Sequence, residues 1–155
     1  MKLKVFFYPL ISLIFLVSCT PDTSSSSNQS SQFDEMIPES LKINWSDSFK
    51  QEDEEYLVFF YSDTCSHCHE IMGDVIAFAE ENIKQTYFAN IISSEGKMPI
   101  VKGGDPITGI DDISDFYIAG TPTLIEIQEG TVTSHIPGKD AILTFLNNER
   151  LNHKN

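Results

Sequence analysis

Residues 56–70 read Tyr-Leu-Val-Phe-Phe-Tyr-Ser-Asp-Thr-Cys-Ser-His-Cys-His-Glu, and this stretch decides the fold that we expect. Its first part, 57–61, is an unbroken run of aliphatic and aromatic residues, which is typical of a strand covered on both faces. Residues 62–64 are Ser, Asp and Thr, whose side-chain oxygens can start a helix. Cys65 would then lie at the positive end of that helix, where unpaired amide groups and the helix dipole favour a thiolate. The stretch therefore predicts a nucleophilic cysteine at a strand–helix junction.

The segments around this stretch predict alternating strands and helices. Apolar residues recur at helical spacing after the first cysteine, which predicts a helix over 65–82. Upstream, alternating apolar residues predict a short edge strand over 41–45, and a Ser-Asp pair predicts a helix over 47–53. Residues 86–92 are strand-like and would complete a βαβ unit with the strand at 56–61.

The second half of the chain predicts a loop, a hairpin and two more helices. Glycines and prolines predict a long loop over 93–109, and loops of this length are functional or mobile. A helix is expected over 111–118, where two aspartates start it and a glycine ends it. The segments 121–127 and 131–136 would form a hairpin around a Glu-Gly turn. A final helix is expected over 139–151, with its apolar side chains on one face.

The N-terminus has the parts of an export signal. Two lysines precede an apolar run, 5–17, that is too short for a comfortable transmembrane helix. Residues 16–19, Leu-Val-Ser-Cys, resemble a bacterial lipobox, in which cleavage before the cysteine leaves a lipid-modified N-terminus. We therefore expect residues 1–18 to be a lipoprotein signal peptide and Cys19 to be the lipid attachment point. An ordinary cleaved signal and a retained anchor are the alternatives.

Residues 19–32 are expected to be a tether that follows the lipid-attachment cysteine. They are rich in Ser, Asn and Gln and have almost no apolar side chains, so they cannot bury enough surface to fold. About twelve such residues would hold the domain roughly 20 Å from its lipid. The remaining residues, 33–155, are expected to form one domain, lipid-anchored to the cell membrane outside the cytoplasm.

The charge of the chain disfavours several kinds of partner. The formal net charge is −13, and it becomes −15 without residues 1–18, which hold two lysines and no acidic side chain. This negative field disfavours nucleic-acid binding and docking on an anionic leaflet through a basic patch. A solvated acidic surface that aids solubility explains the charge more simply than recognition of a basic partner does.

The order of elements and two motifs together resemble one known family. Apart from the helix over 111–118, the expected order is β-α-β-α-β-β-α, an α/β fold with a central mixed sheet flanked by helices. Cys65-Ser-His-Cys68 follows the second strand, and Gly-Thr-Pro-Thr, 120–123, opens the later hairpin. With these features the chain resembles the thioredoxin-like family over roughly residues 40–150. Within that family it looks most like small tethered extracytoplasmic thiol–disulfide proteins of bacteria, the type that includes bacteriocin-transport accessory proteins.

The resemblance implies a thiol–disulfide oxidoreductase. It assigns Cys65 as the attacking thiol and Cys68 as the resolving thiol, one helical turn further along. No dissociable cofactor is needed, because the electrons reside in the two cysteines. The implied partners are cysteine-containing exported proteins or peptides, together with an unidentified redox partner that resets the pair. A Cys-x-x-Cys pair outside the cytosol faces an oxidising compartment, which favours redox chemistry over a permanently reduced metal site.

Four further residues are expected to modulate the site or bind the substrate. Ser66 and His67 separate the cysteines, and an imidazolium at His67 would stabilise the Cys65 thiolate and make the disulfide more oxidising. The alternative is an exposed histidine without an ionic role. Family members hold a cis proline facing the cysteines, and the preceding residue offers its backbone to an extended substrate. The resemblance transfers these roles to Pro122 and Thr121, against an ordinary trans proline.

Three positions depart from the family pattern. Phe59 occupies the place of the buried acid that usually accepts the proton of the resolving thiol, so that proton must use water or another group. Thr64 replaces the tryptophan that usually precedes the first cysteine, which alters the surface facing the substrate. Gly73 replaces the proline that kinks the following helix.

Two other functions are possible for the same segment. Cys65, His67, Cys68 and His69 are all potential ligands for copper or zinc, but neighbouring side chains point apart around a helix and cannot all converge on one ion. We therefore assign no metal site. His135 and His153 are isolated and offer no second ligand pair. A non-catalytic module that binds peptides in the same groove is the other alternative.

Overall fold

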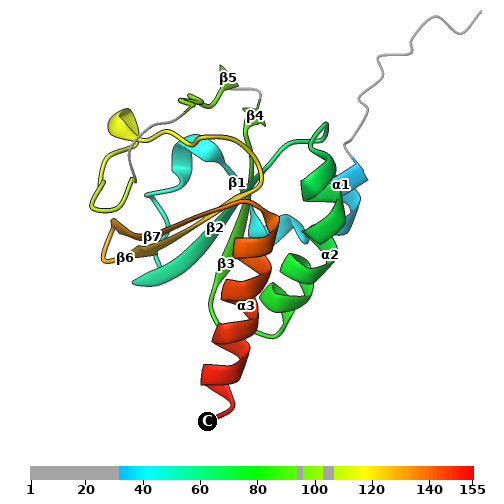
Figure 1. Cartoon of the computed structure of the whole chain (residues 1–155). Coiled ribbons are helices and arrows are strands. Elements are labelled where there is room, and N and C mark those ends of the chain that lie inside the picture. Colours follow the sequence, from blue (N-terminus) through cyan, green and yellow to red (C-terminus); the bar gives the residue numbers. More distant parts are fainter. Residues whose placement is uncertain (1–31, 94–95, 103–106) are drawn as a thin grey trace, which may run out of the picture.

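The structure is a computed structural model that describes residues 32–93, 96–102 and 107–155 (Figure 1). The expected signal peptide, Cys19 and all of the expected tether except its last residue lie outside the described residues. That last residue, Gln32, begins a short helix, α1 (Gln32–Met36), which the sequence did not predict.

A five-stranded mixed sheet forms the centre of the fold (Figure 1). Its strand order is β1-β3-β2-β6-β7. Strands β1 and β2 are parallel to β3, whereas β6 is antiparallel to both of its neighbours, β2 and β7. The bounds of these strands are β1 (Lys42–Asn44), β2 (Glu55–Tyr61), β3 (Thr86–Asn90), β6 (Thr123–Gln128) and β7 (Thr131–Pro137). A separate two-stranded sheet joins β4 (Ile92–Ser93) to β5 (Gly96–Lys97). The expected α/β fold with a mixed sheet is confirmed, as are the edge strand and the hairpin.

The central strand β2 is covered on both faces, as its composition predicts. Every residue from Tyr56 to Tyr61 is buried, and successive side chains point to opposite sides of the sheet. Phe59 lies in the core beneath the helices, whereas Phe60 lies in a second core on the other face. Both faces of this strand therefore contribute to packing.

Two long helices cover one face of the sheet (Figure 1). They are α2 (Ser66–Glu80) and α3 (Lys139–His153), which lie against each other and confirm the two helices expected there. Ion pairs join the helices at both ends, from Glu70 to Lys139 and from Glu81 to Arg150. Helix α1 adds Phe33 to the same core.

The other face is covered by irregular segments instead of helices. The helix expected over 47–53 is wrong, because only the 3-10 turn η2 (Trp45–Asp47) forms. Ser48 ends this turn by donating its hydroxyl to the carbonyl of Trp45 at 2.6 Å. The acidic residues that follow are exposed and supply no apolar face for a helix to bury.

The helix expected over 111–118 is also wrong. This segment contains only the 3-10 turn η3 (Ile113–Asp115), which is capped when the Asp112 carboxylate accepts the Ser114 N–H at 2.7 Å. Phe116 then turns into an extended conformation that buries its ring in the second core. Ile118 forms a parallel bridge with Ile100 and is fully buried. Tertiary burial of these two side chains outweighs local helix propensity.

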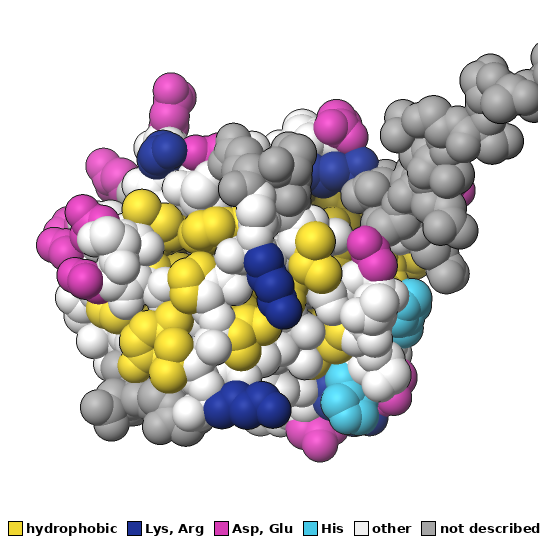
Figure 2. Space-filling model, turned by 90° about the horizontal axis from the view of Figure 1, so that it is seen from above, with side chains coloured by type: hydrophobic (Ala, Val, Ile, Leu, Met, Phe, Trp, Pro, Cys, Tyr) yellow, Lys and Arg dark blue, Asp and Glu magenta, His cyan; other side chains and the backbone are white. Residues whose placement is uncertain are grey.

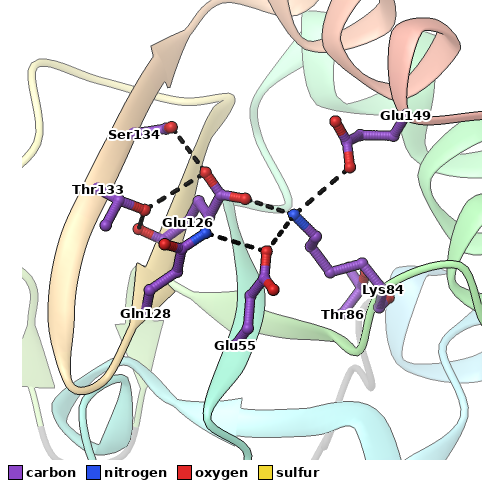
Figure 3. Close-up of polar contacts among 8 residues, drawn as sticks. All are labelled: Glu55, Lys84, Thr86, Glu126, Gln128, Thr133, Ser134 and Glu149. Atoms are coloured by element: carbon purple, nitrogen blue, oxygen red, sulfur yellow. Dashed lines mark hydrogen bonds and ion pairs between the residues drawn. The ribbon is translucent and has the colours of Figure 1, made fainter. Parts of the chain in front are cut away.

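A cluster of polar side chains lies at the end of the sheet that is remote from the start of α2 (Figure 3). Lys84 contacts Glu126, and it lies 2.6 Å from Glu55 and 3.4 Å from Glu149. Burial alone would raise the pKa of Glu126, but hydrogen bonds from Lys84 and Ser134 outweigh it and hold the pKa below its ordinary value. The pKa of Lys84 is raised, because bonds to Glu126 and Glu55 outweigh its burial. The cluster ties β2, β6 and α3 together.

Candidate active site

Cys65 and Cys68 form a disulfide at the amino end of α2. Their Cα atoms are 5.2 Å apart, so the motif brings both sulfur atoms together as the sequence predicts. Cys65 is partly exposed, whereas Cys68 is fully buried in the core beneath the sheet. An incoming thiol or disulfide can therefore reach Cys65 but not Cys68, which suits the first for attack and the second for resolution.

The sulfur of Cys65 itself caps the helix. Cys65 has extended backbone angles, and its Sγ accepts the N–H of Cys68 at 3.1 Å. The side-chain oxygens of residues 62–64, which the sequence suggested for this role, do not cap α2. In the reduced protein the same amide group and the helix dipole would favour a thiolate at Cys65.

Pro122 lies at the same end of the sheet as the cysteines. The Thr121–Pro122 peptide is cis, as the resemblance implies, and Pro122 is buried while Thr121 is partly exposed. The register pairs Phe60 of β2 with Thr123 of β6, so the turn that carries the cysteines and the turn that carries Pro122 extend from neighbouring strand ends. The carbonyl of Pro122 already accepts the N–H of Gly138 at 2.9 Å.

The histidine between the cysteines lies beside a carboxylate. The Nδ1 atom of His67 lies 3.4 Å from Glu70, which also accepts a hydrogen bond from Lys139. Glu70 thus lies between the imidazole of His67 and the ammonium group of Lys139. The hydrogen bond from Lys139 and the nearby His67 lower the pKa of Glu70. Ser66 is exposed beside His67.

His69 contacts the short N-terminal helix. Its ring lies 4.3 Å from the ring of Phe33, measured between centroids, and its Nε2 atom lies 2.9 Å from the carbonyl oxygen of Asp63. Phe33 also packs edge-on against Tyr61 at the end of β2. Helix α1 thus lies beside the cysteine motif. The lone Phe33 in a polar stretch was the signal for this contact.

The position usually occupied by a buried acid provides no proton acceptor. Phe59 is fully buried, with its ring stacked on Tyr61 and edge-on to Phe88. Glu126 is the buried carboxylate among the described residues, but Lys84 holds it at the far end of the sheet. The proton of Cys68 must therefore move through water or another group.

The described residues do not suggest a metal site. No group of three or more His, Cys, Asp or Glu side chains suited to one ion occurs among them. His67 and His69 make contacts with different elements. His135 is separate from both, and its buried Nε2 atom has no hydrogen-bond partner, while burial lowers its pKa. None of the described helices combines the length and hydrophobicity of a membrane span.

Exposed apolar side chains gather at the end of the sheet where α2 begins. Ile92, Ile100 and Val101 are 55%, 37% and 45% exposed, and we call them the apolar rim. Asn90, at the end of β3 and two residues before Ile92, donates a hydrogen bond to Asp63 at 3.1 Å. Figure 2, viewed toward this end, shows hydrophobic side chains across the face and acidic ones around its edge. The sequence indicated only a long loop here.

Comparisons with known proteins give a family match and several similar solved structures. A family model described as Thioredoxin matches residues 36–148, whereas no curated protein matches the chain. Similar solved structures include spinach chloroplast thioredoxin f in its short form. Its sequence is 16% identical, the match covers 70% of this chain and 91% of that chain, and the TM-score is 0.48. Thioredoxin f2 of Chlamydomonas reinhardtii has 15% identity, 70% and 94% coverage and a TM-score of 0.46. A mutant thioredoxin of Halobacterium salinarum has 19% identity, 70% and 88% coverage and a TM-score of 0.44.

Proposed function

We propose that this chain, which belongs to the thioredoxin family and is a thiol–disulfide oxidoreductase, works outside the cytoplasm, attached to the membrane by a lipid on Cys19. Its proposed substrates are cysteines of exported proteins or peptides. In this respect it would be of the small tethered type that includes bacteriocin-transport accessory proteins. The observation that carries the proposal is the cysteine pair, with one reachable and one buried sulfur at a helix start.

The exchange reaction follows from the positions of the two sulfur atoms. In the reducing direction, the Cys65 thiolate attacks one sulfur of a substrate disulfide, and the other substrate sulfur leaves as a thiolate. Cys68 then loses its proton and attacks Cys65, which re-forms the enzyme disulfide and releases the second substrate sulfur. The substrate gains two electrons and the enzyme loses two. The reverse order oxidises a substrate dithiol, and a separate redox partner must reset the enzyme in either case.

The local structure favours Cys65 as the sulfur that enters and leaves mixed disulfides. Its Sγ atom already accepts the amide of Cys68, so the thiolate would gain a hydrogen bond without rearrangement. A stabilised thiolate is present in a larger fraction of molecules at neutral pH, and it is a better leaving group. Cys68 has no such exposure and can react only with its neighbour.

The apolar rim supports a role in binding unfolded or extended substrates. Ile92, Ile100 and Val101 lie on segments that border the cysteine turn and the Pro122 turn. An extended peptide that pairs with the backbone of Thr121 would place its side chains near these residues. Cysteine-containing exported chains expose apolar side chains before they fold, which suits such a surface.

The N-terminal sequence and helix α1 support the proposed tether. The lipobox-like Leu-Val-Ser-Cys segment ends at Cys19, and the described fold begins 13 residues later at Gln32. Because Phe33 contacts His69, the chain enters the domain beside the cysteine motif. A lipid on Cys19 would thus keep the reactive face within roughly 20 Å of the membrane surface.

Two experiments test the proposal. The purified domain should accelerate the reduction of insulin by dithiothreitol, and Cys65→Ser should abolish this activity, whereas Ser66→Ala should keep most of it. Inactive wild-type protein would refute the enzymatic role. In bacterial cells the full chain should fractionate with membranes, and Cys19→Ser should release it. An unchanged membrane fraction for Cys19→Ser would refute lipid attachment.

A further inference from the structure

A three-residue charge cluster borders the cysteine motif. Glu70 lies one helical turn after His67 on α2, and its Oε1 atom is 3.4 Å from the Nδ1 atom of His67. Its other carboxylate oxygen accepts a hydrogen bond from Lys139, the first residue of α3. One carboxylate thus contacts an imidazole and an ammonium group that come from different helices. Asp140 follows Lys139 and adds a further negative charge nearby.

The position of this cluster gives it influence over the reactive sulfur. A cation near Cys65 stabilises the thiolate of the reduced enzyme, whereas an anion destabilises it. Glu70 is five residues beyond Cys65, which corresponds to about 7.5 Å along a helix. The His67 ring contacts Glu70, one turn further along the helix. Whenever His67 is protonated, Glu70 therefore offsets part of the charge that would act on Cys65.

We infer that Glu70 is a positioning residue, which pairs with His67 and Lys139 and keeps the Cys65–Cys68 couple less oxidising than the Cys-Ser-His-Cys motif alone would make it. This inference rests on the proposed role of His67 as a group that stabilises the thiolate. It assigns a function to a residue outside the motif.

The expected size of the effect is small and measurable. An imidazolium charge at His67 that Glu70 no longer offsets, acting roughly 7–8 Å from the sulfur in water, changes an equilibrium constant by roughly two- to threefold. The relevant equilibrium is that of the enzyme disulfide and two glutathione molecules with the enzyme dithiol and glutathione disulfide. Glu70→Gln should shift it about threefold toward the reduced enzyme, which corresponds to a potential about 14 mV higher. Lys139→Met should shift it the opposite way, because a cation is lost and Glu70 is freed.

The test measures this equilibrium for wild-type protein and variants, without oxygen, at pH 6. Glu81→Gln is a matched control, because Glu81 joins the same two helices at their other ends through Arg150, at 2.9 Å. It removes a comparable cross-helix ion pair far from the cysteines and should leave the equilibrium unchanged. The pH dependence of iodoacetamide alkylation should show a lower pKa for Cys65 in Glu70→Gln.

A double-mutant cycle tests whether Glu70 acts through His67. Glu70→Gln should shift the equilibrium less in a His67→Gln background than in the wild-type background. Equal shifts in both backgrounds, no shift, or a shift toward the oxidised enzyme would overturn the inference. Wild-type protein that does not equilibrate with glutathione would overturn both the proposed function and this inference. A wild-type couple that equilibrates normally, with an unaffected Glu70→Gln variant, would overturn the inference alone.

Discussion

Replacing Lys84 by methionine should destabilise the fold by about 2–3 kcal/mol at pH 7. Lys84 is the cationic partner of Glu126, which is only 8% exposed on β6 (Figure 3). Loss of one partner of a buried ion pair typically costs about 3–5 kcal/mol, because the other charge stays buried. The expected cost here is smaller, because the Ser134 hydroxyl still donates to Glu126 at 2.7 Å.

The effect of Lys84→Met should depend on pH in a defined direction. In the wild-type protein the pKa of Glu126 lies below its ordinary value, so the contribution of the ion pair is present above about pH 4.3 and is lost as pH falls through the folded-state pKa. Without Lys84, burial should raise the pKa of Glu126 above the unfolded value. The variant then becomes relatively more stable on acidification. The stability difference between the two proteins should therefore shrink from pH 7 to pH 4.5.

Urea unfolding of the oxidised proteins at both pH values measures this difference. Lys50→Met is a suitable control, because Lys50 and Asp47 form an exposed ion pair and its loss should change the free energy of unfolding by less than about 0.5 kcal/mol. Insulin reduction by folded Lys84→Met protein should match the wild type, since the cluster is remote from the cysteines. A loss below about 0.5 kcal/mol at pH 7, or a difference that grows on acidification, would refute the reasoning.

Three further predictions concern the site and its helix. Cys68→Ser should accumulate mixed disulfides between Cys65 and substrates, visible on non-reducing gels; their absence would place the attacking sulfur elsewhere. Ile100→Asp should raise KM several-fold for a disulfide peptide with apolar flanks and leave kcat within about twofold, whereas an unchanged KM would exclude the apolar rim from binding. Gly73→Ala should raise the free energy of unfolding in urea by about 0.5–1 kcal/mol, because alanine favours the helix and its added Cβ meets no atom within 4 Å. A lower free energy of unfolding would contradict an unstrained helix at this position.

The strong local patterns predicted most of the fold. The run at 57–61, the helical spacing after Cys65 and the Glu129-Gly130 turn each have one good structural solution, and each forms as expected. At the hairpin turn both residues adopt positive φ, at 50° and 77°. Such a turn suits the twist of the flanking strands. Local preference and tertiary burial agree in these segments.

The failures occurred where tertiary contacts decide the conformation. Ile113 and Phe116 lie at helical spacing in the sequence, but Phe116 and Ile118 are buried from an extended backbone against the second core. Helix α1 has only five residues and depends on the contacts of Phe33 with Tyr61 and His69. Periodicity over a short window cannot reveal such contacts.

The cysteine pair could be predicted from the sequence, but its charged surroundings could not. Cys65 and Cys68 form the expected disulfide, and Pro122 follows the expected cis peptide bond. Lys139 reaches Glu70 across 69 positions of sequence, and no local pattern indicates that contact. Glu70 therefore acquired a candidate role only when the packing of α3 on α2 was known.

The midpoint potential of the Cys65–Cys68 couple tests the central claim most directly. A redox titration with glutathione, quenched by alkylation and measured by mass spectrometry, gives this potential for the wild-type protein. An exchange-active pair should show one reversible two-electron transition between about −270 mV and −120 mV. A potential below about −300 mV, typical of a structural disulfide, or a pair that does not re-form after reduction, would contradict the account.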